Sequence, residues 1–287
     1  MSLREVDKAA WTGGAGAGDQ TVAIESGNVL VCLDLGFKTL ASEAQLFTPG
    51  ILASAKNASF DPATGRLGGT SLTSADAAGL ASMLRRFSDA AAGLVAGLCP
   101  AYRGRLVRGR ASFRPAEIAG RPTSWRKDDT RLHVDSFPAT PTGGRRILRV
   151  FSNVNPEARP RAWRVGDAFE STARRFADRL QPPVPGSGRL MALLRITKSP
   201  RTPYDALMLQ LHDAMKRDEA FQSSSPQTRV EFPSGSTWLC FTDEVSHAAM
   251  SGQYQLEQTF LLPVDAMQNP ERSPLRILER IKGRSLV

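Results

Sequence analysis

Reactive and metal-binding residue types are scarce in this sequence. Its 287 residues include three cysteines and three histidines, and the cysteines are isolated in apolar surroundings. No cysteine pair has the spacing of a zinc knuckle or of a disulfide framework, so we expect three buried, reduced thiols in a cytosolic protein. Any histidine-based site must be built from His133, His212 and His247.

Long hydrophobic runs are also missing. No apolar stretch of the sequence is long enough to cross a bilayer. Residues 1–8 carry charges where a signal peptide would be hydrophobic. We therefore expect a soluble protein that is not exported.

Acidic residues are outnumbered by basic ones. The 37 Lys and Arg against 28 Asp and Glu give a formal net charge of +9. This excess predicts an anionic partner, which could be nucleic acid, an acidic metabolite or an anionic lipid surface. The basic clusters lack regularly interleaved aromatic residues, and no nucleic-acid-binding motif accompanies them, so we expect no nucleic acid partner.

Short segments of strand type dominate the second half of the chain. Turn signals separate them at intervals of about ten residues, which predicts a β-sandwich or barrel. The clearest helical pattern covers residues 73–98 and should pack against one side of a sheet. Further helices are expected at 165–180 and 203–221, as decoration on the strand scaffold. The expected strands are residues 106–113, 130–137, 146–154, 229–232, 237–241, 245–249 and 254–262.

His133 and Asp135 form the most informative pair in the sequence. In a strand, side chains alternate with a period of two, so both would point to one face. Together with His247 they make a two-histidine, one-carboxylate set, which leaves three metal positions open and suits non-haem Fe(II). A zinc hydrolase could use the same ligand types. His212 lies beside Asp213 in a predicted helix, and we expect it to be a surface or capping residue.

Two predicted strands place polar residues among apolar ones. Arg149 shares a strand face with Phe151, and burying its charge would require an anion such as a carboxylate. Gln258 shares a face with Leu256, so its amide would need a partner in the interior. These positions suggest an anion-binding interior beside the candidate metal ligands.

The same residues carry a family resemblance. His133, Asp135 and His247 resemble the iron ligands of Fe(II)- and 2-oxoglutarate-dependent dioxygenases. Longer stretches are similar to bacterial 3-deoxy-D-manno-oct-2-ulosonic acid (Kdo) 3-hydroxylases over roughly residues 100–285. These stretches are RLHVDSFP at 131–138, GRRILRVFSNVNP at 144–156, PYDALMLQLHD at 203–213, and the region from GSTW at 235–238 through His247 to QTF at 258–260.

The resemblance implies a mainly β, α+β fold. It is the double-stranded β-helix, a cupin-like jelly roll, with flanking helices. We expect one domain over residues 1–287. The first 100 or so residues would support the core with a helix and strands, and about 101–265 would form the jelly-roll core with a helical insertion at 163–221. Residues 266–287 would be a basic tail.

The resemblance also implies the reaction. The chain would hydroxylate carbon 3 of Kdo in the lipopolysaccharide inner core, on a Kdo-lipid A precursor, while 2-oxoglutarate is converted to succinate and CO2 with consumption of O2. His133, Asp135 and His247 would be the catalytic residues and would hold Fe(II), and ascorbate would serve as reductant in an assay.

The cosubstrate contacts depart from the pattern of the superfamily. Many of these enzymes bind the far carboxylate of 2-oxoglutarate with an arginine a short distance beyond the distal histidine, and here Gln258 occupies that neighbourhood. We therefore expect Arg149 to bind this carboxylate. The alternatives are Arg146, which faces the other side of the same predicted strand, and Gln258 itself.

An anionic glycolipid substrate fits the excess of arginine. Kdo carries a carboxylate and lipid A carries phosphates, so we expect a cytoplasmic protein with peripheral contact at the inner face of the inner membrane. Two alternatives remain open. The first is a related dioxygenase that acts on another small anionic substrate, and the second is a non-catalytic jelly-roll module that binds acidic glycans.

Overall fold

The structure is a computed structural model that describes residues 2–12, 18–53, 56–121 and 123–287. Its larger sheet has eight strands in the order β1-β2-β9-β6-β11-β5-β3-β4. β1 and β2 are parallel, and all other neighbours are antiparallel. The strands are β1 (Leu3–Glu5), β2 (Val29–Cys32), β3 (Ala58–Phe60), β4 (Leu67–Gly68), β5 (Val107–Arg114), β6 (Arg146–Asn153), β9 (Thr237–Phe241) and β11 (Gln255–Leu262).

A smaller antiparallel sheet packs on one face of the larger one. Its strands are β10 (His247–Ser251), β7 (Arg161–Gly166) and β8 (Gln227–Phe232), in that order. Between the sheets the rings of Phe232 and Trp238 stack with centroids 4.0 Å apart. Side chains alternate along β9, so Trp238 faces the smaller sheet and Leu239 faces the other side. This is a β-sandwich of the predicted α+β class, and among the described strands no ladder closes it into a barrel.

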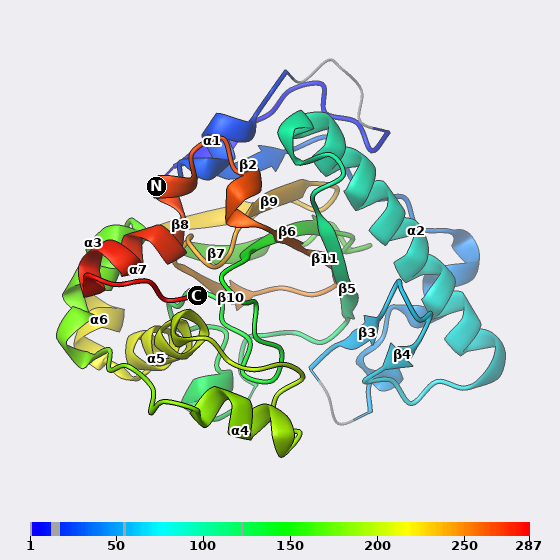
Figure 1. The fold of residues 1–287 in the computed structure, drawn as a ribbon. Helices are drawn as coiled ribbons and strands as arrows, with labels where there is room; N and C mark the ends of the chain where they lie inside the picture. The colour runs from blue at the N-terminus through cyan, green and yellow to red at the C-terminus, as the bar shows by residue number, and fades with distance from the viewer. Residues whose placement is uncertain (1, 13–17, 54–55, 122) are drawn as a thin grey trace.

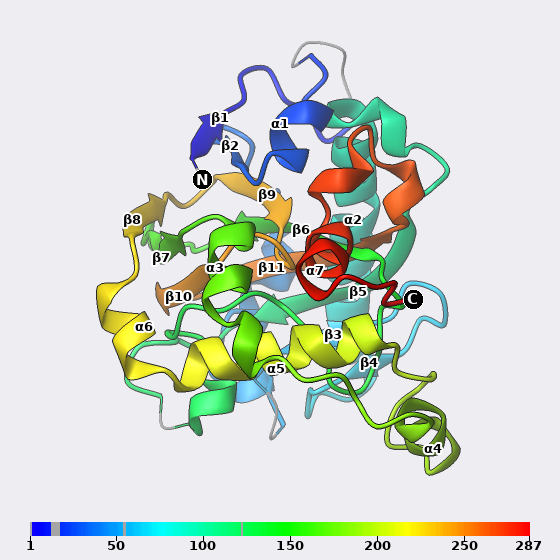
Figure 2. The same ribbon diagram turned by 60° about the vertical axis from the view of Figure 1, so that its left-hand side comes forward.

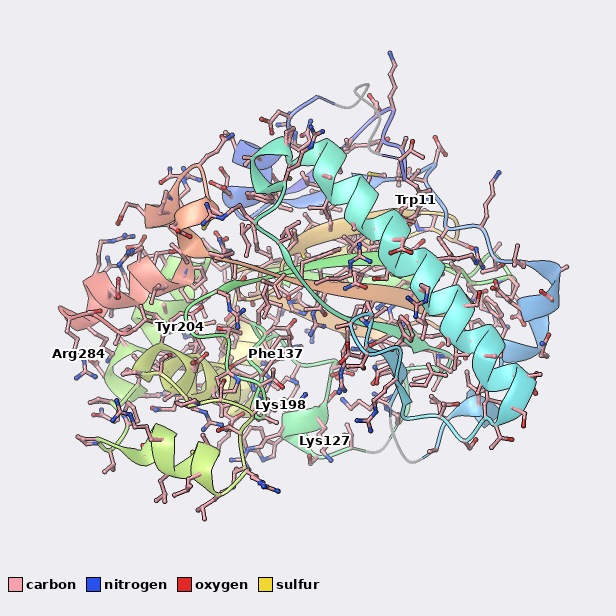
Figure 3. All side chains as sticks on the ribbon, turned by 45° about the vertical axis from the view of Figure 1, so that its right-hand side comes forward. Trp11, Lys127, Phe137, Lys198, Tyr204 and Arg284 are labelled. Carbon is pink, nitrogen blue, oxygen red and sulfur yellow. The ribbon has the colours of Figure 1, made fainter. Side chains whose placement is uncertain are left out.

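Seven α-helices of the described chain flank the two sheets. α2 lies across the outer face of the larger sheet, against β3, β5 and β11 (Figures 1 and 3). The apolar residues that predicted this helix, such as Leu80, Phe87 and Leu94, form its buried face. The helices are α1 (Thr21–Glu25), α2 (Ser74–Leu98), α3 (Phe169–Arg175), α4 (Ser187–Leu193), α5 (Pro203–Arg217), α6 (Glu219–Ser224) and α7 (Pro274–Lys282).

Helices α3 to α7 lie on the opposite side of the molecule from α2, whereas α1 contacts β2 and β9. Figures 1 and 2 show α3, α5, α6 and α7 beside the sandwich, with α4 at its outer margin. None of the described helices combines the length and the apolar character that a membrane crossing requires. The three cysteines are buried and free, as predicted, and burial raises the pKa of each thiol.

Three local predictions were wrong. Residues 130–137 do not form a ladder strand, because this segment meets β10 only at a single bridge between His133 and His247. Residues 56–72 are rich in Gly, Asn and Pro, which predicts a loop, but they contain β3 and β4, which pair at the sheet edge. The helix expected from residue 165 begins only at Phe169, because residues 161–166 pair with two neighbouring strands as β7.

Candidate metal centre and anion pocket

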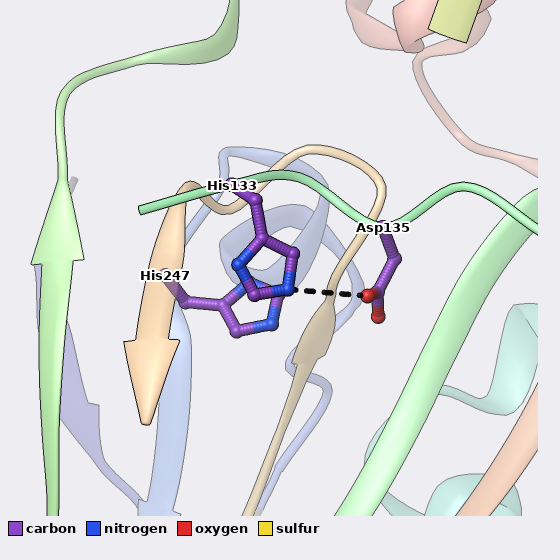
Figure 4. A group of neighbouring side chains, drawn as sticks. All are labelled: His133, Asp135 and His247. Carbon is purple, nitrogen blue, oxygen red and sulfur yellow. Dashed lines mark ion pairs between the residues drawn. The ribbon is translucent and has the colours of Figure 1, made fainter. Parts of the chain in front are cut away.

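His133, Asp135 and His247 converge as the sequence predicted (Figure 4). Each offers one nitrogen or oxygen atom that could bind a metal, and these atoms all lie within 4.8 Å of one another. His133 and His247 exchange two backbone hydrogen bonds of 3.0 and 2.9 Å, and the Asp135 N–H donates to the Thr242 carbonyl at 2.7 Å. The backbone alone therefore sets the spacing of the three side chains.

Both histidines present Nε2 to the centre of the group. His133 Nδ1 lies 2.7 Å from the Arg131 carbonyl oxygen, and His247 Nδ1 lies 2.8 Å from the Val245 carbonyl oxygen. A carbonyl oxygen can only accept, so Nδ1 of each ring carries the proton and Nε2 keeps its lone pair. A backbone carbonyl that fixes the outer nitrogen is the usual arrangement at metal-binding histidines.

The three side chains are in the protonation states that a metal requires. Burial lowers the pKa of both imidazoles, and at His133 the neighbouring His247 adds to this effect. Burial opposes ionisation of Asp135, but Arg149 and the two histidines outweigh it and lower the pKa of its carboxyl. Metal ligands must be deprotonated. Two neutral imidazoles and one carboxylate fit an Fe(II) ion with open positions.

A cavity of about 180 Å³ adjoins these residues. Its volume is below the roughly 300–1,000 Å³ of pockets that enclose drug-sized ligands, so it suits a small acid better than a whole glycolipid. Trp163 forms part of the wall and stacks on the His247 ring, with centroids 5.1 Å apart. Besides the three candidate ligands, the lining residues are Arg114, Asp129, Phe137, Arg149, Phe151, Arg161, Trp163, Ala249, Gln255 and Glu257.

Arg149 lines the cavity but already has partners. Its Nε lies 3.3 Å from Asp135 Oδ2, an ion pair without hydrogen-bond geometry, and its Nη1 lies 3.1 Å from Glu257 Oε1. Arg114 is also paired, with Nε 3.0 Å from Glu257 Oε2. Arg149 therefore contacts the Asp135 carboxylate, and the carboxylates of Asp135 and Glu257 balance its charge.

Arg161 is a buried cation of the cavity that has no counter-ion among the residues that the structure describes. It is 2% exposed, its Nη1 donates to the Gly252 carbonyl at 2.7 Å, and its Nε has no hydrogen-bond partner. Burial, together with Arg114, lowers the pKa of Arg161 to about 9. No carboxylate in the described part of the chain forms an ion pair with it. A buried charge without a partner is costly, so this position calls for an anionic ligand.

The local backbone is built around Arg161. Gly252 has φ +107°, and a side chain there would place its Cβ 3.1 Å from the Arg161 Cα. Glycine permits both this conformation and this close approach. On β7, Arg161 shares a face with Trp163 and Val165, and Val165 pairs with His247, so one strand presents the arginine and the wall of the metal centre to the same cavity.

Two residues expected at the cosubstrate lie elsewhere. Gln258 faces the α2 side of the larger sheet and donates to the Gly109 carbonyl at 3.0 Å, while its neighbour Glu257 takes the cavity face. Arg146 is fully buried, with Nε 2.9 Å from Asp243 and Nη2 2.6 Å from Glu244. Alternation along β11 and β6 separates both residues from the cavity, so we do not retain them in the candidate site.

His212 is closer to the centre than expected. It lies on α5, and its ring packs edge-on against His133 with centroids 5.4 Å apart, whereas its Nδ1 lies 3.0 Å from Asp213. It is a packing neighbour of His133 and not a surface or capping residue. It does not belong to the group of three that could hold a metal.

The position of Arg146 predicts a structural role. We expect Arg146→Met to lower the free energy of unfolding by about 3–5 kcal/mol, because it leaves two buried carboxylates unpaired. Burial raises the pKa of Glu244 to about 7 even beside Arg146. Stability linked to a raised carboxyl pKa is present below the ordinary value of 4.5 and is lost as the pH rises through about 7. The loss in the variant should therefore grow from acidic to neutral pH.

Urea unfolding at acidic and at neutral pH measures this effect. Arg105→Met is the matched control, because its ion pair with Asp265 is exposed and should contribute little. A similar loss in both variants, or a loss at Arg146 that does not depend on pH, would contradict the structural role.

The chain is similar to Kdo hydroxylases along nearly its whole length. A family profile described as 3-deoxy-D-manno-oct-2-ulosonic acid (Kdo) hydroxylase matches residues 15–285. The crystal structure of the Kdo hydroxylase KdoO, a non-heme Fe(II) α-ketoglutarate-dependent dioxygenase, in complex with α-ketoglutarate and Fe(III), is 43% identical with a TM-score of 0.94, and covers 100% of this chain and 98% of that chain.

Two further KdoO structures match as well. The complex with cobalt(II) is 44% identical with a TM-score of 0.95, and the complex with succinate and Fe(III) is 43% identical with a TM-score of 0.94. Each covers 99% of this chain and 97% of the KdoO chain. Among curated proteins, none matches the sequence.

Proposed function

The chain belongs to the Kdo hydroxylase family, and we propose that it hydroxylates carbon 3 of Kdo in a lipid A precursor of the lipopolysaccharide inner core. Its solved relative KdoO is a non-heme Fe(II) α-ketoglutarate-dependent dioxygenase, and α-ketoglutarate is 2-oxoglutarate. The chain is therefore an oxidoreductase that uses Fe(II), 2-oxoglutarate and O2. This membership replaces the alternative of a non-catalytic glycan-binding module.

One observation in this structure supports the proposal independently of the family match. Three metal-ready side chains open onto a small cavity that also holds a buried arginine with no counter-ion among the described residues. His133, Asp135 and His247 would hold Fe(II), since their donor atoms and protonation states fit it. The bound iron and 2-oxoglutarate together supply oxygen activation, with succinate and CO2 as the products of the cosubstrate.

Arg161 is our choice for the far carboxylate of 2-oxoglutarate, in place of Arg149. A ligand carboxylate would supply the missing counter-charge of Arg161 and could accept two hydrogen bonds from its planar guanidinium. Arg149 already has Asp135 and Glu257 as partners. Its proposed role is to hold Asp135 in the orientation that binds the metal, as outer partners of metal ligands do.

The apolar wall protects the reaction from water. Phe151 and Trp163 are each 2% exposed and line the cavity. A closed, apolar wall strengthens electrostatic interactions inside the site and limits side reactions with solvent. Phe137 also lines the cavity and is only half-buried, and we infer that the Kdo sugar enters beside it.

The place of action is part of the proposal. A precursor of lipid A is a membrane lipid with anionic groups, and the net charge of +9 favours binding to such a surface. We infer that the protein works from the cytoplasm, as a peripheral protein at the inner face of the inner membrane. The three buried free thiols agree with a reducing compartment.

The identity of the substrate can be tested by asking which lipid accelerates the release of succinate. Anaerobically purified protein given Fe(II), 2-oxoglutarate, ascorbate and air should release succinate faster when a Kdo-lipid A precursor is added. The same lipid without Kdo is the control and should give no acceleration. If both lipids act alike, the oxygenase remains but Kdo is excluded as its substrate, and another small anionic molecule takes its place.

A further inference from the structure

Helix α4 and the segments beside it carry an exposed apolar surface. Of the eleven large hydrophobic residues exposed in the described chain, five lie between positions 184 and 196, and the others are scattered. We call these five the α4 surface. Its residues, with their exposed fractions, are Val184 (75%), Leu190 (55%), Leu193 (80%), Leu194 (60%) and Ile196 (56%). Exposed apolar residues that cluster in this way mark an interaction site.

The chain segment that carries the α4 surface has charges of a single sign. No aspartate or glutamate lies between Asp178 and Asp205, whereas five arginines and lysines do. Three of them, Arg189, Arg195 and Lys198, are exposed, and none of these three forms an ion pair with a described residue. Exposed leucines within a cationic rim are complementary to a bilayer with anionic headgroups.

The chain beside the α4 surface is hydrogen-bonded to the segment that follows Asp135. The Lys198 N–H donates to the Ala139 carbonyl at 2.9 Å, and Arg201 Nη2 donates to the Pro138 carbonyl at 2.6 Å. These carbonyls belong to the segment that follows Asp135, and Phe137 of the same segment lines the cavity. α4 itself lies at the outer margin of the molecule (Figure 2).

We propose that the α4 surface docks the protein on an anionic lipid bilayer. Leu193 and Leu194 enter the headgroup region, while Arg195 and Lys198 contact lipid phosphates. This inference rests on the proposed function, because a glycolipid substrate keeps its acyl chains in the bilayer while its sugar enters the cavity beside Phe137. Docking at α4 would bring the membrane close to the segment that carries Phe137.

A second copy of the chain fits this surface less well. A symmetric dimer through the α4 surface would bring the cationic rims of both copies together, and like charges across an interface are unfavourable. A bilayer that contains phosphatidylglycerol supplies the opposite charge and an apolar interior at once. The observations therefore favour the lipid surface as the occupant.

Vesicle co-sedimentation tests the proposal without any turnover. The protein should bind phosphatidylcholine vesicles that contain phosphatidylglycerol, more weakly at high salt, and should bind pure phosphatidylcholine poorly. The double variant Leu193→Ser/Leu194→Ser should reduce partitioning about tenfold or more, since two exposed leucines lose their burial in lipid. Val22→Ser on α1 is the control, because Val22 is 67% exposed but lies apart from this surface.

Each outcome decides between occupants. No binding of the unchanged protein to either vesicle, or an equal loss in Val22→Ser, overturns the proposal. A dimer in light scattering that Leu193→Ser/Leu194→Ser dissociates assigns the surface to a second copy instead. Vesicle binding that persists when Kdo turnover fails would leave the docking surface standing and would reject the proposed substrate.

Discussion

Asp135→Ala is expected to lower iron-dependent turnover by on the order of a thousandfold or more, because a bound metal ion lowers the activation barrier by several kcal/mol. The variant removes the only carboxylate of the candidate metal group. The two imidazoles would remain held by their backbone hydrogen bonds, so the cavity should persist. The loss should therefore lie in the metal and not in the fold, and far-UV circular dichroism should be unchanged.

A binding measurement separates this effect from a general loss of activity. Titration with cobalt(II), followed by visible absorption, should show a dissociation constant at least about a hundredfold higher for Asp135→Ala, more than the loss expected when only an outer partner is removed. Asp265→Ala is the control, because this side chain is 75% exposed and its ion-pair partner is Arg105, which does not line the cavity. Wild-type cobalt affinity in Asp135→Ala would remove this residue from the metal centre.

Arg161→Met is expected to raise the KM for 2-oxoglutarate by roughly a hundredfold or more, because a buried charge pair with the cosubstrate is lost. Turnover at saturating 2-oxoglutarate should fall less. The thermal midpoint without ligands should stay the same or rise, because the variant removes a buried cation that lacks a counter-ion in the described structure. A residue kept for stability would behave in the opposite way, as Arg146 should.

Arg149→Met is the matched comparison from the same cavity. It should weaken metal binding and turnover through Asp135, with a smaller change in the KM for 2-oxoglutarate. The reverse result, with a raised KM in Arg149→Met and an unchanged KM in Arg161→Met, would restore the sequence-based choice of Arg149 as the anchor.

The sequence predicted those features that depend on local signals. α2 follows from apolar residues at helical spacing, and β6, β9 and β11 follow from strand propensity between turns. The convergence of His133, Asp135 and His247 could be predicted because so few histidines compete for the role. A single bridge is enough to bring His133 beside His247. The wrong prediction of a strand over residues 130–137 therefore did not affect this outcome.

The anion pocket could not be predicted, because it depends on which faces of several strands meet. Gln258 was expected in the interior and is buried, but it faces the side of the larger sheet that α2 covers. Its neighbour Glu257 faces the cavity. Arg161 was missed because residues from 163 onward were interpreted as helical. The alternation of Arg161, Trp163 and Val165 could have indicated a strand with these three side chains on one face. Only the pairing of this strand with β10 shows that this face points to the cavity.

The fate of the oxygen atoms of O2 shows whether the protein hydroxylates Kdo. The protein should be supplied with Fe(II), 2-oxoglutarate, ascorbate, a Kdo-lipid A precursor and isotopically heavy oxygen gas, and the lipid product analysed by fragmentation mass spectrometry. We expect one heavy oxygen atom at carbon 3 of Kdo, formed together with succinate, and no such product from Asp135→Ala. Succinate formed without any heavy oxygen in the Kdo unit would contradict the proposed function.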